Sequence, residues 1–236
     1  TGVMARLRRV ITAIIVGLCC LLSVSSGPFL ALLTQVGLIG WAVGMRWTGM
    51  RWRILGTIAT VFYVVAELAS NRPAIYAIVS QLAFNPATAF SRRILFERGV
   101  EQVGNAPILG IGYNDFLLPA WMSGSIDNFW LFLAITFGLP AFLFFATAFL
   151  VSMIRIGMRD FSTVPDLIPL RLAWIFTMIS LTICLGTVAI WGELYSFVLL
   201  MLGSGMWLLS VETTQPVQAP TSEPPRQQVS RARYTR

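Results

Sequence analysis

Six long apolar runs divide this chain of 236 residues, and short polar segments separate them. A helix needs about 20 mostly apolar residues to cross the roughly 30 Å hydrocarbon core of a bilayer, because each residue rises about 1.5 Å. The pattern therefore predicts an all-α, polytopic transmembrane helix bundle of about six spans. The expected spans are Val10–Leu22 with an extension of small residues over Ser23–Ser26, Pro28–Met45, Ile54–Ala69, Asn128–Val151, Leu170–Ile190 and Leu194–Val211.

The composition agrees with a membrane environment and excludes several classes of protein. Hydrophobic residues make up 56% of the chain and charged residues only 11%, whereas an average soluble domain has about 25% charged residues. So few charges do not cover a soluble protein of this size, which argues against a cytosolic enzyme, a nucleic-acid-binding domain and a disordered chain. The sequence also has no histidine, so a histidine base or a histidine metal ligand is excluded.

All 17 basic residues are arginine, and they are distributed unevenly about the predicted spans. If the spans alternate in direction, 13 arginines fall on one side and four on the other. The positive-inside rule makes the richer side cytoplasmic and places both ends of this segment there. The net charge of +7 is therefore mainly a feature of membrane topology. The four arginines of the outer side are Arg72, Arg92, Arg93 and Arg98.

The two ends of the chain carry expectations of their own. Residues 212–236 combine four prolines with polar residues and arginine. This composition predicts a disordered, basic cytoplasmic tail after a transmembrane domain over residues 1–211. Because the chain begins at Thr1, we expect it to be a fragment or a processed product of a longer protein.

One external connection, residues 70–127, is long, and loops of more than about 15 residues are often functional. Within it, Pro73–Phe84 is apolar but too short to span, which indicates an interfacial or re-entrant helix. Arg92–Val103 has the charge spacing of an amphipathic helix, and Gly104–Asn105 is a stop signal. The outer loop is therefore expected to be helical and to carry the chemistry.

A turn with two glycines, Gly110 and Gly112, follows the predicted amphipathic helix. A dinucleotide-binding loop would have its third glycine at the position of Asp115, and no strand precedes the turn, so that interpretation is disfavoured. We instead predict a turn in which the backbone approaches a ligand closely.

The external arginines Arg92, Arg93 and Arg98 are either solvated surface charges or parts of an anion-binding site. Guanidinium groups bind phosphate oxygens through paired hydrogen bonds, so a diphosphate is the natural anion. Arg92 and Arg98 lie about 120° apart around a helix, and one small site does not take both from one face. Arg92 or Arg93 is the better candidate, and Arg98 is expected to be peripheral.

Asp127 stands where the chain enters the fourth predicted span, and two roles are open to it. Asp127 or Ser125 would cap the helix by accepting backbone N–H bonds. Alternatively, a carboxylate beside the membrane and opposite a basic loop is placed to act as a general base. Further along the span, Gly138-Leu-Pro140 predicts a kink.

Several segments, taken together in their order and spacing, resemble the O-antigen ligase and polymerase family. The segments are Arg92–Gly99, Asn105–Phe116 with its Pro-x-x-Gly-x-Gly turn, Ser125–Leu131, Gly138–Phe142 and the serine-rich Ser23–Pro28. The resemblance covers about residues 10–211 and implies a bacterial inner-membrane glycosyltransferase. Members take glycan from an undecaprenyl-diphosphate carrier on the periplasmic side. They are typically longer at the N-terminal side, so this chain resembles their C-terminal half.

The resemblance leaves two acceptors open. Ligases pass the glycan to lipid A core, and polymerases pass it to another carrier-linked repeat unit. Ligases usually place a histidine where Asp127 and Asn128 stand here, so the chain is more similar to a polysaccharide-polymerase branch with Asp-Asn-Phe-Trp. The implied partners are the undecaprenyl-diphosphate-linked oligosaccharide, the lipid bilayer and, as further candidates, other polysaccharide-assembly proteins. A nucleic acid is not among them.

The implied site has Arg92 on the carrier diphosphate and Asp127 as the group that deprotonates or orients the acceptor hydroxyl. Trp121 and Trp130 offer flat faces to sugar rings or anchor the membrane interface. The sequence has no metal-ligand cluster and no nucleotide-sugar motif, so we expect metal-independent transfer without a cofactor. The expected substrate-binding residues are Arg93, Arg98, Gly110, Gly112, Asn114, Asp115 and Asn128.

Two other functional classes compete with a transferase. A transporter places polar residues at the midplane of broken helices, whereas these spans are nearly free of charge and polarity concentrates in one external loop. A non-catalytic membrane scaffold does not require the ordered series of Arg, Gly-x-Gly and Asp-Asn. The sequence therefore favours the glycosyltransferase over both.

Overall fold

The computed structural model describes residues 2–23, 25–69, 86–114, 126–188, 190 and 192–211, and every regular element within them is a helix. This confirms the all-α fold class. The predicted helix Pro73–Phe84 and the predicted tail lie outside the described residues. The elements are α1 (Val3–Leu22), α2 (Ser26–Gly44), α3 (Arg51–Ala69), α5 (Pro86–Asn105), α6 (Phe129–Met158), α7 (Leu167–Leu185), α8 (Glu193–Gly203) and the short 3-10 helix η1 (Met206–Leu209).

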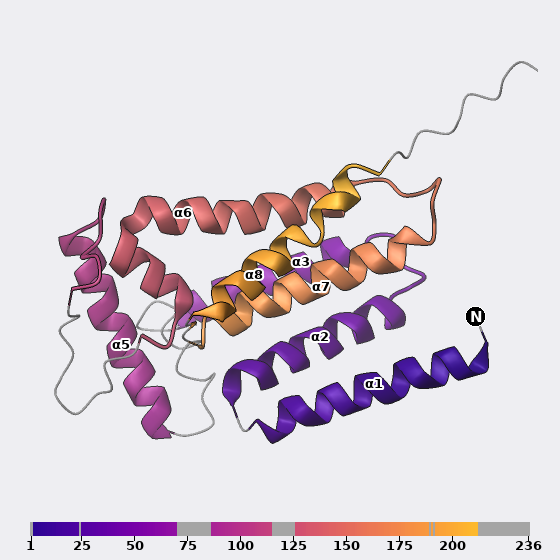
Figure 1. The fold of residues 1–236 in the computed structure, drawn as a ribbon, viewed down its shortest axis with the longest axis horizontal. Coiled ribbons are helices and arrows are strands. Elements are labelled where there is room, and N and C mark those ends of the chain that lie inside the picture. Colours follow the sequence, from indigo (N-terminus) through magenta and orange to yellow (C-terminus); the bar gives the residue numbers. More distant parts are fainter. Residues whose placement is uncertain are drawn as a thin grey trace, which may run out of the picture.

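The long helices lie along a common direction, and α5 crosses one end of the bundle (Figure 1). Helix α2 packs between α1 and α7, α6 packs on α7, and α5 packs on α6. The start of α1, the α2–α3 and α6–α7 connections and the end of η1 gather at the opposite end (Figure 1). Three of the four arginine groups that the sequence assigned to one side thus come from segments at that end, and the fourth is in the undescribed tail.

Every predicted span contains a helix, but some boundaries were wrong. Helix α7 ends at Leu185 rather than Ile190, and α8 ends at Gly203, after which only η1 continues. Helix α5 begins at Pro86 rather than Arg92, because proline has no N–H to leave unsatisfied and its fixed φ suits the first helical position. The predicted spans ran past Gly186 and Gly203, whereas α7 ends just before Gly186 and α8 ends at Gly203.

Four described helices, α2, α3, α6 and α7, are long and apolar enough to cross a membrane by length and composition. Helix α1 has 20 residues but carries three arginines in its first two turns, and α8 has only 11 residues. The protein is a multi-pass membrane protein, and a count of six spans stays a prediction at α1 and α8.

The packed core lies between α6, α7 and α8 and is rich in aromatic rings. Phe129, Phe149 and Met178 are almost inaccessible, and Trp130 packs edge-on against its phenylalanine neighbours. Helices α1 and α3 instead expose most of their large apolar side chains. In water such exposure would be costly, but in a bilayer the same surface faces lipid tails.

Candidate functional site

Arg92 joins three elements that are distant in the sequence. Its Nη2 donates to Oγ of Ser26 at 2.8 Å and to the carbonyl oxygen of Thr187 at 3.2 Å. Ser26 begins α2, Thr187 follows α7, and both residues are buried. We call this part of the bundle, formed by α5, the first turns of α2 and α6 and the residues after α7, the Arg92 end.

Small residues allow the Arg92 end to close. A Cβ added at Gly27 would lie 2.7 Å from Cγ1 of Val188 and 2.9 Å from Oγ1 of Thr187. A Cβ added at Gly99 would lie 2.6 Å from Cδ2 of Leu131, where α5 meets α6. These separations are below normal carbon contact distances of about 3.5–4.0 Å, so a larger residue at either glycine would force the neighbouring side chains to shift.

Sequence reasoning missed the contact between Ser26 and Arg92. The signal that pointed to it was the serine-rich turn Ser23–Pro28, which carried part of the family resemblance but received no site role. The contact joins residues 66 positions apart, and no local periodicity predicts such a pair.

Asp127 and Asn128 face Arg92 across a small cavity at the start of α6. The cavity has a volume of about 10 Å³, which is room for roughly one water molecule. Burial lowers the pKa of the Arg92 guanidinium, and the negative charge of Asp127 opposes that shift. Arginine stays protonated in proteins, so the cavity holds two opposite charges. Its other lining residues are Leu95, Phe96, Leu131 and Gly186.

The N-cap of α6 is Asn128, so the capping role predicted for Asp127 was wrong. Asn128 has an extended backbone, and its Oδ1 accepts the N–H of Leu131 at 3.0 Å. Asp127 is exposed, and Ser125 lies outside the described residues. The Asp127 carboxylate is therefore placed beside the Arg92 cavity without serving as the helix cap.

The other two predicted arginines point along the surface of α5. Arg93 Nε donates to Oε1 of Glu97 at 2.9 Å, one helical turn away, as the spacing predicted. Arg98 Nη1 donates to Oε2 of Glu101 at 3.0 Å, and both side chains are exposed. The structure thus brings Arg92 to the junction with α2 and α7, while Arg93 and Arg98 form surface ion pairs.

The glycine turn fills a break in α6 that the sequence predicted. Pro140 has no N–H for the carbonyl of Thr136, and Gly138 leaves the helical conformation with φ 83° and ψ 173°. The carbonyls of Ile135 and Thr136 instead accept the N–H groups of Ile111 and Gly112, both at 2.9 Å. In return Leu139 donates to the carbonyl of Pro107 at 2.8 Å. The break therefore costs few hydrogen bonds, because the turn replaces them.

Glycine is required where the two backbones meet. Gly110 has φ +66°, and an added Cβ would lie 2.5 Å from the carbonyl oxygens of Ile135 and Thr136. A Cβ on Gly138 would lie 2.2 Å from the carbonyl oxygen of Ile108. Gly112 also has a positive φ, +68°, but faces open space. The predicted close approach of backbone thus occurs at Gly110 with α6 as its partner, and a ligand contact stays a prediction.

The last two residues of the predicted turn have separate outcomes. The side-chain amide of Asn114 donates to the carbonyl oxygen of Ile111 at 2.6 Å and closes the turn. Asp115 lies outside the described residues, and so does Trp121. A sugar contact from any of them is not tested by the described part of the chain.

An apolar groove opens beside the Arg92 cavity, between α5, α6 and α7. Its volume is about 720 Å³, within the range of pockets that hold small ligands. The groove and the cavity share Phe96, Asn128, Leu131 and Gly186, so the cavity that Arg92 and Asp127 line adjoins the groove. Trp130 forms part of its wall, where its Nε1 donates to the carbonyl oxygen of Thr182 at 3.0 Å.

A family model described as O-antigen ligase matches residues 11–146. The match covers more than half of the chain and includes Ser26, Arg92, the glycine turn and Asp127. The chain belongs to the O-antigen ligase family. This assignment implies a membrane enzyme of the glycosyl-transfer type, ligase or polymerase. No curated protein and no solved structure matches the chain.

The match to the O-antigen ligase family ends within α6. Helices α7 and α8 therefore lie beyond it, and so does Thr187, whose carbonyl binds Arg92. The contact of Arg92 with the segment after α7 therefore comes from the structure and lies outside the family match.

Proposed function

We propose that this O-antigen ligase family member polymerises undecaprenyl-diphosphate-linked repeat units on the periplasmic face of the bacterial inner membrane. The observation that carries the proposal is the position of Arg92. Its charged guanidinium lines a small cavity that adjoins an apolar groove, with the Asp127 carboxylate nearby. A lipid-linked diphosphate has the matching order of parts, a long apolar chain that ends in an anionic group.

The proposed reaction uses the two charges in different roles. The acceptor hydroxyl oxygen bonds to the anomeric carbon of the donor glycan, and the bond from that carbon to the carrier diphosphate breaks. Asp127 takes the proton of the hydroxyl group. The bonding electrons leave with the diphosphate, whose added negative charge Arg92 stabilises.

The groove supports the same substrate class. Its wall consists almost entirely of apolar side chains from α5, α6 and α7. A prenyl chain bound in the groove would therefore have fewer conformations and a more defined orientation than a prenyl chain free in the bilayer. The carrier diphosphate would then lie at the end of the groove that adjoins the Arg92 cavity. Because a guanidinium supplies the positive charge for the leaving group, we expect transfer to continue in the presence of EDTA.

Replacement of Arg92 tests the proposal. Arg92→Ala should reduce extension of carrier-linked glycan about 10²- to 10³-fold, the usual effect of removing one donor to a developing charge. Arg92→Lys keeps the charge but loses the planar guanidinium, so its rate of glycan extension should lie between those of Arg92→Ala and the unmodified protein. The measurement is the chain-length ladder in cells together with the amount of inserted protein. A normal ladder in Arg92→Ala would refute the assignment.

A ligase is the second candidate, because the matching family model carries that description. The two activities leave different products when Arg92→Ala removes them. Loss of a polymerase leaves single repeat units transferred to the acceptor, whereas loss of a ligase leaves long glycan on the carrier. We expect the first result, since ligases usually have a histidine where Asp127 and Asn128 stand.

A transporter is disfavoured by the state of the break in α6. Transporters use the free backbone groups of broken helices to hold substrates and ions. Here the carbonyls of Ile135 and Thr136 already accept hydrogen bonds from the glycine turn. Substrate flux in proteoliposomes without glycosyl transfer would reverse this ranking.

A further inference from the structure

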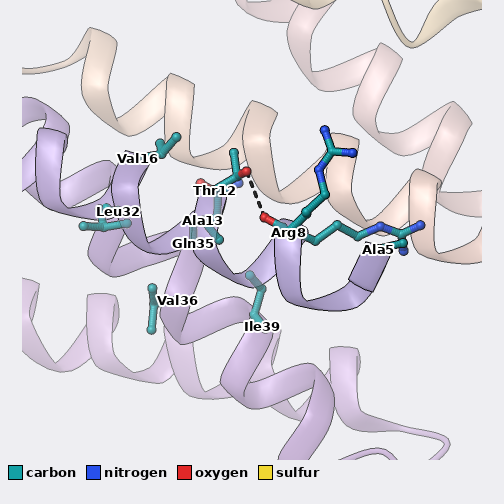
Figure 2. Close-up of a pocket in the computed structure, with 11 residues that line it drawn as sticks. Ala5, Arg8, Thr12, Ala13, Val16, Leu32, Gln35, Val36 and Ile39 are labelled. Atoms are coloured by element: carbon teal, nitrogen blue, oxygen red, sulfur yellow. Dashed lines mark hydrogen bonds between the residues drawn. The ribbon is translucent and has the colours of Figure 1, made fainter. Parts of the chain in front are cut away.

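A second large hollow lies between α1 and α2, away from the Arg92 cavity. Its volume is about 740 Å³, and side chains of both helices line it (Figure 2). Arg8 lies toward one end of the hollow, and Val16 and Leu32 lie toward the other (Figure 2). The lining residues are Ala5, Arg8, Arg9, Thr12, Ala13, Val16, Gly17, Leu32, Gln35, Val36 and Ile39.

The hollow has a strongly basic end and no acidic lining residue. Arg8 and Arg9 line it, and the first acidic residue of the sequence is Glu67. Neither arginine forms an ion pair with a described residue. An anion at this end would therefore gain from two guanidinium groups that form no ion pair with a described residue.

The remainder of the hollow is apolar because its polar groups are already bonded. Thr12 Oγ1 donates to the carbonyl oxygen of Arg8 at 2.9 Å. Gln35 Nε2 donates to Oγ1 of Thr177 on α7 at 3.2 Å. The surface between α1 and α2 therefore offers mainly aliphatic side chains to an occupant.

The length of the hollow fits one leaflet of a bilayer. Nine residues separate Arg8 from Gly17 along α1, which corresponds to about 14 Å of helix. Half of a hydrocarbon core of roughly 30 Å is about the same length. The basic end thus falls at headgroup level when the apolar part lies among the acyl chains.

We propose that this hollow binds one anionic phospholipid, with the phosphate on Arg8 and Arg9 and an acyl chain between α1 and α2. Basic pockets between membrane helices on the cytoplasmic side are suited to anionic headgroups. The arginine distribution assigns this end to the cytoplasmic leaflet. The site is separate from the Arg92 cavity, so the proposal does not depend on the proposed reaction.

The charge of the site is tested with the full-length protein in nanodiscs of phosphatidylcholine with and without phosphatidylglycerol. Native mass spectrometry should show retained phosphatidylglycerol in preference to phosphatidylcholine. The Arg8→Gln/Arg9→Gln double variant should retain it about tenfold less or weaker still, since each basic group near an anionic surface contributes to lipid affinity. The matched control is Arg46→Gln/Arg53→Gln, which makes the same charge change at exposed residues outside the hollow and should retain the lipid.

The shape of the site is tested without a change of charge. A Cβ at Gly17 meets nothing within 4 Å, so Gly17→Phe should fold while its ring fills the hollow and displaces the lipid. Gly56→Phe on α3 is the control, because Gly56 is equally open and does not line the hollow. Added inorganic phosphate should not displace the lipid, which distinguishes a lipid site from a phosphate site.

Three results would overturn the proposal. The first is equal retention of phosphatidylglycerol by the Arg8→Gln/Arg9→Gln variant and its control. The second is equal retention of phosphatidylcholine by the unmodified protein. The third is the absence of any lipid bound to the unmodified protein.

Discussion

Arginine side chains join helices at both ends of the bundle, but they contact different kinds of group. At the Arg92 end, Arg92 binds Ser26 and the carbonyl of Thr187 and has the Asp127 carboxylate nearby. At the opposite end, Arg159 donates to the carbonyl oxygens of Leu209 and Val211. We call the group formed by Arg159, Phe161, Arg171 and these two carbonyls the Arg159 cluster.

The terminal guanidinium nitrogens of the Arg159 cluster donate to carbonyl groups of the protein, although the buried Nε atoms of Arg159 and Arg171 have no hydrogen-bond partner among the described residues. Helices leave their last carbonyls without partners, and Arg159 donates to the carbonyl of Leu209, which ends η1, and to that of Val211 just beyond it. Arg171 donates to the carbonyl of Arg159, and both guanidinium groups lie over the ring of Phe161, at 6.0 Å and 5.6 Å from its centroid. Phe161 is only 1% exposed. The cluster therefore fastens the ends of α6, α7 and η1.

The nearest acid to the Arg159 cluster in the sequence is already engaged elsewhere. Asp160 is exposed and accepts the backbone N–H of Ser162 at 2.9 Å and its hydroxyl at 3.0 Å. These bonds lower the pKa of Asp160. The two ends therefore differ in what surrounds the arginine: an apolar groove and the exposed Asp127 carboxylate lie near Arg92, whereas the Asp160 carboxylate near Arg171 is bonded to Ser162.

The largest expected effect is that of Asp127→Asn. The amide is nearly the same size but does not take a proton, so glycan extension should fall about 10²- to 10⁴-fold, the usual contribution of a general base. Since Asp127 is exposed and does not cap α6, the thermal unfolding temperature should stay close to that of the unmodified protein. If activity stays within a few-fold of normal, Asp127 is not the general base. The Asp127 carboxylate would then no longer distinguish the function of the Arg92 end from that of the Arg159 cluster.

Arg159→Ala should act on stability and not on chemistry. It removes charge-assisted hydrogen bonds to two carbonyls, and we expect a loss of about 2 kcal/mol in the free energy of unfolding. Activity per folded molecule should be unchanged. The free energy of unfolding is measured by denaturation in detergent. Arg155→Ala is the control, because Arg155 is an exposed residue of α6. A fall in activity without a fall in stability would contradict the structural role.

Ser26→Ala should have a smaller effect on the reaction. It removes the 2.8 Å contact that orients Arg92, and a hydrogen bond to a charged group is worth about 1.5–3 kcal/mol. We expect activity to fall about tenfold and Ser26→Thr, which keeps the hydroxyl, to restore most of it. Ser23→Ala is the control, because the Ser23 hydroxyl donates to its own turn at Cys20. Equal activity of Ser26→Ala and Ser23→Ala would show that Ser26 does not position Arg92.

Arg98→Ala should have the smallest effect. Its ion pair with Glu101 is exposed, and surface pairs contribute about 0–1 kcal/mol. Both stability and glycan extension should stay within about twofold of normal in the assays used for Arg92→Ala. A loss as large as that of Arg92→Ala would place Arg98 in the substrate site and widen the Arg92 end along α5.

Sequence patterns predicted some features of the Arg92 end, such as the kink in α6, but not the residue that caps this helix. Helix geometry indicated that Arg92 and Arg98 do not serve one small site together, because about 120° of rotation separates their directions, and the family resemblance then favoured Arg92. The kink at Gly138 followed from the missing N–H of Pro140. Asp127 and Ser125 were the candidates for the cap of α6, and the structure gives Asn128 instead, because neighbouring polar side chains suit that position and only the backbone geometry distinguishes them.

The glycine turn illustrates a feature that a local sequence pattern leaves undetermined. Two glycines with positive φ indicate close approach by another group, but the sequence does not say which. The structure identifies the partner at Gly110 as the freed carbonyls of α6. The same limit applies to Ser26, whose partner lies on another helix.

The sequence by itself determined the membrane environment, the all-α class, the six apolar segments and the concentration of polar chemistry in one connection. These features depend on properties that add along the chain, such as hydropathy, helix period and charge. The tertiary structure decided that Ser26, Arg92 and Thr187 meet, that the glycine turn closes the break in α6 and that Arg159 fastens the other end. Those contacts depend on the packing of separate helices, and a pattern that repeats within one helix holds no information on which neighbour it will touch.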